Sequence, residues 1–128
     1  MSTFPTELRY TNDHEWIRVQ GTSWRVGITQ FAVDALGDIT LVDLPKEGDQ
    51  VTKGQRFGTV ESVKSVSDLY APVSGRVVAV NSALKDAPED VNAEPYGKGW
   101  MIEVEPNDKG ELDELMTADA YTQHVAAQ

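Results

Sequence analysis

The chain has 128 residues, which is enough for one domain to bury a core without disulfides or metals. Its 21 acidic and 11 basic side chains give a formal net charge of -10, which argues against nucleic acid or an anionic membrane as a partner. The sequence has no cysteine and only two histidines, so thiol nucleophiles and the usual zinc sites are excluded. No apolar run approaches the roughly 20 residues of a membrane-spanning helix, and no signal or transit sequence is recognisable. We therefore expect a soluble protein.

The first elements are predicted to be a hairpin and a helix. Residues 15–19 and 24–28 have the composition and alternation of two short strands separated by a turn. In the next segment, residues 29–37, the apolar side chains change to helical spacing. Thr29 is suited to cap the start of this helix, and Gly37 is suited to end it. One short internal helix is therefore expected to interrupt the β structure.

Strand signals then resume along most of the remaining chain. We expect strands at residues 39–44, 50–52, 57–60, 66–70, 76–81 and 100–104. Two of them, 66–70 and 76–81, are expected to pair around a turn at 72–75, and the polar segment 82–98 is expected to be a long surface excursion. Short, evenly spaced strands suit a small sandwich or flattened barrel, so the fold is predicted to be mainly β.

The C-terminal tail is predicted to be helical. Residues 108–124 place apolar side chains at helical spacing, with charged side chains on the opposite face. We expect one domain over residues 1–128, with its core at about 10–105 and a helical appendage at about 107–125.

Lys64 differs in context from the other lysines. A hairpin tip is predicted at residues 62–65, because Val60, Val63 and Val66 interrupt the alternation there. The turn lacks Gly, Asn and Pro, so it should be of type I or slightly longer, without positive φ. An exposed lysine is by default a solvated charge. The other lysines lie beside Pro, Gly or acidic turn residues, whereas Lys64 lies in a β-rich stretch.

Motifs around Lys64 and along the rest of the chain follow one pattern. The central motif is Glu61-Ser62-Val63-Lys64, followed by Ser67-Asp68 and Pro72-Val73-Ser74-Gly75. The others are Tyr10, His14-Glu15-Trp16, Val26-Gly27-Ile28-Thr29, Ala35-Leu36-Gly37-Asp38, Leu44-Pro45, Gly48-Asp49, Pro95-Tyr96-Gly97, Gly99-Trp100 and Leu112-Asp113-Glu114-Leu115. In order and approximate spacing they resemble the glycine cleavage H-protein family over nearly the whole chain.

This resemblance implies a lipoyl/biotinyl-type barrel-sandwich hybrid with a short internal helix and a C-terminal helical appendage. It implies lipoate as a covalent cofactor in amide linkage to Lys64, with Glu61 and Gly75 recognised by the lipoylating enzyme. It also implies that Glu15 and Asp68 line a cleft for the loaded arm. It implies no catalytic residue and no metal ligand.

The function that the resemblance implies is that of a non-catalytic carrier. Its lipoyl-lysine arm would take the aminomethyl group of glycine from glycine decarboxylase, a pyridoxal-phosphate enzyme, to a tetrahydrofolate-dependent aminomethyltransferase. Dihydrolipoyl dehydrogenase would then reoxidise the arm. These enzymes and the lipoylating enzymes are the expected partners of a chain that is monomeric when free. The expected location is the bacterial cytoplasm, or the mitochondrial matrix for a processed eukaryotic form.

The residues around Lys64 differ from those typical of other carrier domains. A biotinyl domain usually has Met on both sides of its lysine, whereas Val63 and Ser65 flank Lys64. A lipoyl domain of a 2-oxoacid dehydrogenase normally has an Asp-Lys-Ala core and lacks the terminal additions seen here. A protein that relays lipoate to such enzymes, and an unmodified β-sandwich interaction protein, remain open alternatives.

Asp13 and His14 directly precede Glu15 in the sequence. His14 is not expected to act with Glu15 as an acid–base pair, because adjacent side chains of a regular strand point to opposite faces. We expect a structural or surface role for it. Asp13 departs from the small hydroxyl residue that the family often has at this position.

Overall fold

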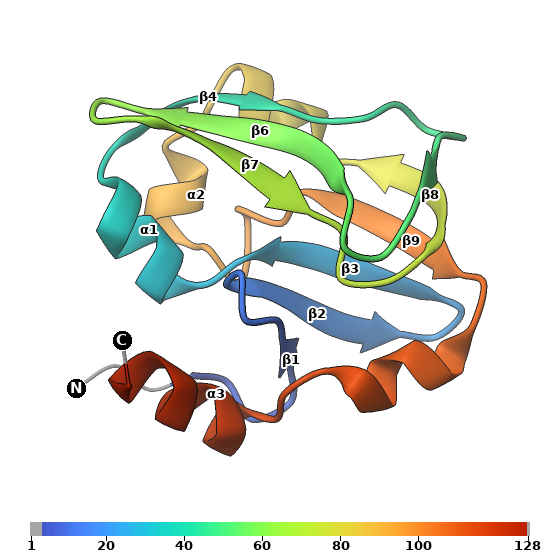
Figure 1. Ribbon diagram of the computed structural model, residues 1–128. Coiled ribbons are helices and arrows are strands. Elements are labelled where there is room, and N and C mark those ends of the chain that lie inside the picture. Colours follow the sequence, from blue (N-terminus) through green and yellow to red (C-terminus); the bar gives the residue numbers. More distant parts are fainter. Residues whose placement is uncertain (1–3, 128) are drawn as a thin grey trace.

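The computed structural model of the protein describes residues 4–127, in which two antiparallel sheets are surrounded by short helices (Figure 1). The strands are β1 (Arg9–Tyr10), β2 (Glu15–Gln20), β3 (Ser23–Ile28), β4 (Ile39–Asp43), β5 (Gln50–Val51), β6 (Arg56–Ser62), β7 (Val66–Tyr70), β8 (Gly75–Val80) and β9 (Ile102–Pro106). The helices are α1 (Gln30–Leu36), α2 (Asp90–Ala93) and α3 (Ala118–Ala126), with 3-10 turns η1 (Ser82–Lys85) and η2 (Lys109–Glu114). The larger sheet has the order β1-β2-β3-β9-β8-β5, and the smaller has the order β4-β6-β7.

Local sequence signals predicted the first elements correctly. Strands β2 and β3 pair as an antiparallel hairpin, from Glu15 opposite Ile28 to Gln20 opposite Ser23. The Thr29 side chain caps α1 by accepting a hydrogen bond from the Ala32 amide. Gly37 ends the helix with a φ of 81°, a conformation that favours glycine. The predicted hairpin and internal helix are confirmed.

The predicted pairing of residues 66–70 with residues 76–81 is wrong. Strand β7 pairs with β6 in the smaller sheet, whereas β8 lies between β9 and β5 in the larger one. The linking residues Ala71, Pro72 and Val73 are buried, unlike the exposed tip of a hairpin. The chain therefore crosses from one sheet to the other at this point instead of turning back.

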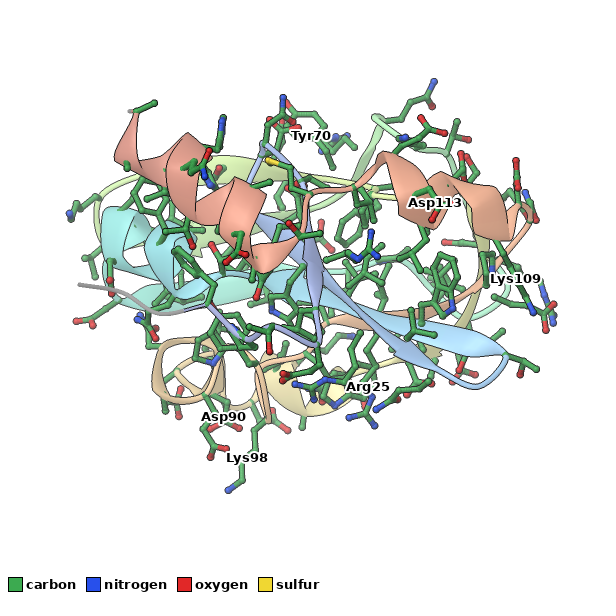
Figure 2. All side chains as sticks on the ribbon, turned by 90° about the horizontal axis from the view of Figure 1, so that it is seen from below. Arg25, Tyr70, Asp90, Lys98, Lys109 and Asp113 are labelled. Atoms are coloured by element: carbon green, nitrogen blue, oxygen red, sulfur yellow. The ribbon has the colours of Figure 1, made fainter. Side chains whose placement is uncertain are left out.

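The prediction that residues 82–98 form a long surface excursion is only partly correct. This segment forms η1 and α2, and it inserts Leu84 and Val91 into the core with 1% and 0% of their surface exposed. Figure 2 shows Asp90 and Lys98 on the outside of the same segment. Apolar residues spaced this widely give no periodic signal, so their anchoring role depends on the tertiary fold.

The larger sheet is covered on both faces at β2. Ile17 belongs to the core between the two sheets, and its neighbour Trp16 belongs to a second cluster on the opposite face. That second cluster contains Phe4, Leu8, Tyr10, Trp16, Ala118 and Tyr121. Helix α3 therefore closes the face of the sheet that points away from the smaller sheet (Figure 1). Among residues 4–127, no helix is both long and apolar enough to cross a membrane.

Candidate functional site

Lys64 lies at the exposed tip of the β6–β7 hairpin (Figure 1). The Ser62 amide donates to the Ser65 carbonyl at 2.8 Å and closes the turn. The Ser62 hydroxyl accepts hydrogen bonds from the amides of Lys64 and Ser65, each at 3.2 Å. Positive φ among the described non-glycine residues occurs only at His14. The predicted turn without positive φ is confirmed, and a serine side chain stabilises it.

The Lys64 amine makes no ion pair or hydrogen bond with any residue in the range 4–127. By contrast, Lys53 binds Glu114 at 2.6 Å, and Figure 2 shows Lys98 and Lys109 on other parts of the surface. On either side of Lys64, Val63 and Val66 leave 68% and 64% of their surface exposed. The tip therefore presents an accessible amine between two apolar side chains, which suits contact with another protein.

Glu61 lies on the central strand of the smaller sheet, three residues before Lys64. It is half-buried and pairs with Val66 on β7 and with Leu41 on β4. Its backbone is thus held on both sides, which gives the lysine a fixed base. Glu61 and Lys64 belong to one hairpin, as the sequence predicts.

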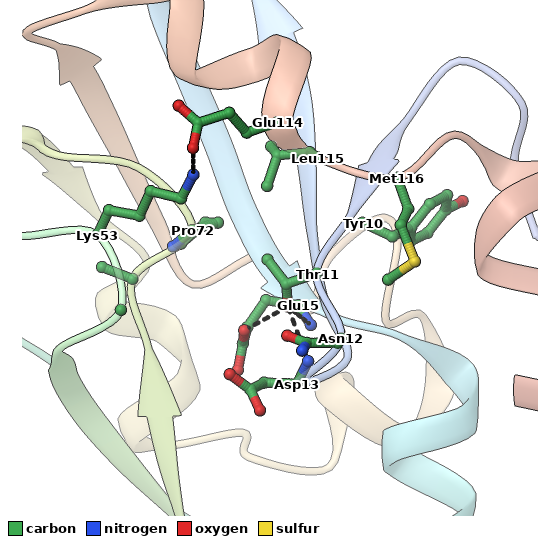
Figure 3. A pocket seen from close by; sticks show the side chains of 12 residues that line it. Tyr10, Thr11, Asn12, Asp13, Glu15, Lys53, Pro72, Glu114, Leu115 and Met116 are labelled. Atoms are coloured by element: carbon green, nitrogen blue, oxygen red, sulfur yellow. Dashed lines mark hydrogen bonds and ion pairs between the residues drawn. The ribbon is translucent and has the colours of Figure 1, made fainter. Parts of the chain in front are cut away.

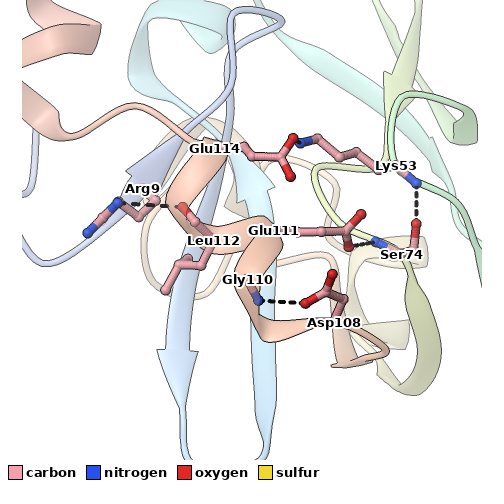
Figure 4. Close-up of polar contacts among 8 residues, drawn as sticks. All are labelled: Arg9, Lys53, Ser74, Asp108, Gly110, Glu111, Leu112 and Glu114. Carbon is pink, nitrogen blue, oxygen red and sulfur yellow. Dashed lines mark hydrogen bonds and ion pairs between the residues drawn. The ribbon is translucent and has the colours of Figure 1, made fainter.

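Gly75 is the first residue of β8 and lies in the larger sheet. A Cβ atom at this position would overlap the Glu105 carbonyl oxygen and would lie 2.6 Å from Val104 Cγ1. Gly75 therefore packs closely against strand β9. Just before it, the Ser74 amide donates to Glu111 Oε1 at 2.8 Å, and Ser74 Oγ accepts from the Lys53 amide at 2.9 Å (Figure 4). The first contact attaches η2 to the beginning of β8, and the second attaches the loop between β5 and β6.

We expect Gly75→Ala to lower the free energy of unfolding by about 1–3 kcal/mol, because the new methyl group must displace the backbone of β9. The matched control is Gly97→Ala, whose Cβ would lie 3.0 Å from the mobile end of the Glu94 side chain. Urea unfolding of both variants measures the difference. Equal stability of the two variants would show that the contact with β9 adapts without cost.

Glu15 is buried in the wall of a pocket of about 330 Å³ (Figure 3). The pocket is lined by Tyr10, Thr11, Asn12, Asp13, Glu15, Lys53, Gly54, Ala71, Pro72, Glu114, Leu115 and Met116. The Thr11 hydroxyl donates to Glu15 Oε1 at 2.6 Å, and the Tyr70 amide of β7 donates to Oε2 at 3.4 Å. Only 2% of Glu15 is exposed, and this burial raises its carboxyl pKa from 4.5 to about 8. At neutral pH the pocket therefore contains a mostly protonated carboxyl group.

Asp68 is exposed on β7 opposite Thr59 and does not line this pocket. It precedes Tyr70 by two residues, so the two side chains share one face of the strand. The geometry connects Asp68 to Glu15 only through β7, by the hydrogen bond from the Tyr70 amide. Lys64 belongs to the turn and lies two residues before β7, so the chain separates it from Asp68 by at most about 14 Å.

His14 has the expected structural role, but for a different geometric reason. It precedes β2 with a φ of 72°, so it is not part of a regular strand. Its Nδ1 atom lies 2.7 Å from the Tyr121 hydroxyl, which lies 2.8 Å from Thr29 Oγ1. The Tyr121 hydroxyl thus connects His14 and helix α3 to Thr29 at the beginning of α1. Burial lowers the pKa of His14 below its ordinary 6.5.

Known proteins match this chain over nearly its whole length. The family model described as "Glycine cleavage H-protein" matches residues 8–128. The chain belongs to this family. It is 56% identical over 123 residues to the glycine cleavage system H protein of Anoxybacillus flavithermus, covering 96% of this chain and 97% of that protein. It is 54% identical over 128 residues to the one from Halalkalibacterium halodurans, covering both chains completely.

The fold also agrees with that of a solved H protein. The crystal structure of a glycine cleavage system H protein from Mycobacterium marinum superimposes with a TM-score of 0.89 at 44% sequence identity, covering 96% of this chain and 99% of that one. The predicted barrel-sandwich hybrid with its internal helix and helical appendage is confirmed. Membership of the family does not favour a 2-oxoacid dehydrogenase lipoyl domain, a lipoate relay protein or an unmodified interaction protein.

Three residues of this H-protein site were not predicted from the sequence. Thr11 accepts from the Asp13 amide at 3.2 Å, a local serine/threonine turn that its spacing could have indicated. Ser62 stabilises the tip, and a serine opening a turn without Gly, Asn or Pro could have indicated this too. Asn92 binds the backbone next to the hairpin from a distant helix, and no local signal could have predicted its role.

Proposed function

We propose that this chain carries a lipoyl group in amide linkage to Lys64 and serves as the carrier of a glycine cleavage system. The observation that supports the proposal most directly is the accessible Lys64 amine on a closed hairpin tip, in a member of the H-protein family. When bound, a lipoyl group supplies a dithiolane that accepts an aminomethyl group and is later reoxidised. The residues of this chain fix the base of the arm and leave its end mobile.

The reach of such an arm is compatible with the face of β7. A lysine extended by a lipoyl group has about a dozen bonds, a reach on the order of 14 Å. Asp68 is four residues from Lys64, a separation of at most about 14 Å, so it lies within this reach. Glu15 binds the Tyr70 amide, two residues further along the same strand. We propose that Asp68 accompanies the arm and that Glu15 receives its end.

The buried carboxyl of Glu15 suits a positively charged amine. With a pKa of about 8 it is mostly neutral when the pocket contains no cation. An ammonium group beside it would lower the pKa and form a charge-assisted hydrogen bond. Ionisation of Glu15 would then accompany binding of the amine. Asp13 also lines the pocket and adds a negative charge at its wall.

Recognition by the lipoylating enzyme depends in this proposal on Glu61 and Gly75. Glu61 is fixed between two strands close to the lysine, and Gly75 allows β8 to approach β9 closely. The two residues belong to different sheets, so an enzyme that reads both must recognise the folded domain and not a linear peptide. We propose that residues 1–128 act as this one carrier domain, with its core at about 10–105 and its tail at about 107–125.

The proposed partners follow from this carrier function. They are glycine decarboxylase, aminomethyltransferase, dihydrolipoyl dehydrogenase and the lipoylating enzymes. The chain contributes no catalytic residue of its own, is monomeric when free, and binds neither nucleic acid nor membrane. Bacterial relatives support a cytoplasmic location.

We expect Glu15→Ala and Asp68→Ala to leave lipoylation intact but to accelerate loss of the aminomethyl group from the arm. Both changes remove a carboxyl acceptor from the path of the arm, and neither residue lies at the attachment turn. Release of formaldehyde and ammonia from loaded protein, followed over time, measures the decay. A decay rate equal to that of the parent protein would contradict the proposed cleft.

The proposal is tested by intact mass spectrometry of protein from cells supplied with lipoate, with peptide fragmentation to locate any added group. We expect a lipoyl-sized increment on Lys64. An unmodified Lys64, in cells that lipoylate their other carriers normally, would refute the carrier function.

A further inference from the structure

We infer that residues 37–39, the turn between α1 and β4, position the carrier lysine, and that Asn92 of α2 fixes this turn. The inference rests on the proposed attachment of a lipoyl group to Lys64. It assigns a role to Asn92, which lies outside the hairpin and outside the Glu15 pocket.

The hairpin tip contacts the 37–39 turn directly. The Val63 amide donates a hydrogen bond to the Asp38 carbonyl at 3.0 Å. The stem of Lys64 lies against Gly37, because a Cβ atom at Gly37 would be 3.1 Å from Lys64 Cε and 3.9 Å from Nζ. The turn thus holds the residue before the lysine and supports the end of its side chain.

Glycine is required at position 37 for two independent reasons. Its φ of 81° and ψ of -154° are strongly unfavourable for residues with a side chain. Its missing side chain also leaves the space in which the stem of Lys64 lies. The end of α1 is therefore shaped to receive the lysine.

Asn92 binds the turn on both sides. Its Oδ1 atom accepts a hydrogen bond from the Ile39 amide at 2.8 Å, and its Nδ2 atom donates to the Gly37 carbonyl at 2.9 Å. A single side chain amide therefore fixes the two backbone groups that flank Asp38. The carbonyl of Asp38, which receives the Val63 amide, is held in place between them.

The beginning of β4 strengthens this connection. Ile39 pairs with Ser62 and Leu41 pairs with Glu61, which leaves Thr40 as an extra residue in a bulge. The Thr40 hydroxyl donates to the Glu61 carbonyl at 3.3 Å. The 37–39 turn and the base of the tip therefore move as one unit, with Asn92 as their connection to α2.

This connection matters because, among residues 4–127, the other hydrogen bonds of Lys64 and Ser65 are made to Ser62 of the same turn. Ordering one backbone residue costs about 1–2 kcal/mol, so a tip that is already ordered is easier for an enzyme to bind. Asn92 is a positioning residue in this scheme, since it touches the backbone that supports Lys64 and does not touch the lysine. Its loss should weaken binding of the hairpin by the lipoylating enzyme more than it slows acyl transfer.

The test compares Asn92→Ala with Asn81→Ala in the complete chain. Asn81 is a matched control, because its Nδ2 atom donates to two carbonyls, Lys98 at 2.8 Å and Trp100 at 2.7 Å, away from the tip. The first measurement is the backbone order parameter of the Val63 and Lys64 amides by ¹⁵N relaxation. The second is the steady-state kinetics of lipoylation by a purified lipoylating enzyme with free lipoate and ATP, which activates the carboxylate for amide formation.

For Asn92→Ala we expect lower order parameters at both amides and a KM for the protein substrate raised about fivefold, with kcat within about twofold. For Asn81→Ala we expect the parent values. Asn92→Asp keeps the size of the side chain and loses the bond to the Gly37 carbonyl, so it should change KM in the same direction if the alanine variant does not fold.

Parent-like order and KM in a folded Asn92 variant would overturn the inference, as would equal changes in the Asn81 control. If the parent protein accepted no lipoyl group, the proposed function would fail. The relaxation measurement would still decide whether Asn92 orders the tip.

Discussion

Lys64→Arg is expected to abolish lipoyl attachment completely while the protein remains folded. The guanidinium group stays protonated in proteins and cannot act as the nucleophilic amine that amide formation requires. Lys64 is exposed and its amine has no partner among residues 4–127, so the free energy of unfolding should change by less than about 0.5 kcal/mol. Intact mass after coexpression with a lipoylating enzyme measures the attachment.

The matched control for this prediction is Lys98→Arg. Lys98 is also exposed, and its contact with Glu94 is a surface pair at 3.9 Å. This variant should receive the lipoyl group as the parent does. A lipoyl-sized increment that persists in Lys64→Arg would move the attachment to another lysine and would remove the hairpin tip from the mechanism.

The parts of the fold that the sequence predicted well depend on neighbours in the chain. Thr29 and Gly37 cap a helix through residues three or four positions away, and the β2–β3 hairpin joins adjacent strands. The predicted pairing of β7 with β8 was wrong, because the path of the chain between these strands depends on burial. Ala71 and Val73 become core residues only when the two sheets face each other, and no local pattern distinguishes such a crossing from a turn.

The same distinction applies to the site. The place of Lys64 at a hairpin tip could be predicted, because the break in strand alternation there is a local feature. The Asn92 contacts could not be predicted, because they join residues 53 and 55 positions apart in the sequence. The protonated state of Glu15 was also missed, since it arises from a pocket whose wall includes residues from both ends of the chain.

Glu15 should make the protein less stable as the pH rises. The folded carboxyl has a pKa of about 8 and the ordinary value is 4.5, so the unfolded chain releases this proton first. The stabilisation by protonated Glu15 is complete below pH 4.5 and is lost progressively as the pH rises to about 8. Between about pH 6.5 and pH 8.5, we expect the free energy of unfolding to fall by roughly 2 kcal/mol from this residue. His14 does not contribute to this fall, because its lowered pKa destabilises the fold only on the acid side of 6.5.

Glu15→Gln should remove most of this slope. The uncharged amide has nearly the shape of the carboxyl group, and its oxygen can accept from the Thr11 hydroxyl, so this position carries no titrating charge at any pH. Glu47→Gln, at an exposed position, is the control and should keep the parent slope. Urea unfolding across this pH range gives the three slopes. If Glu15→Gln were as steep as the parent, Glu15 would already be ionised in the folded protein, and the neutral acid that we propose as the acceptor for an arriving ammonium would not exist.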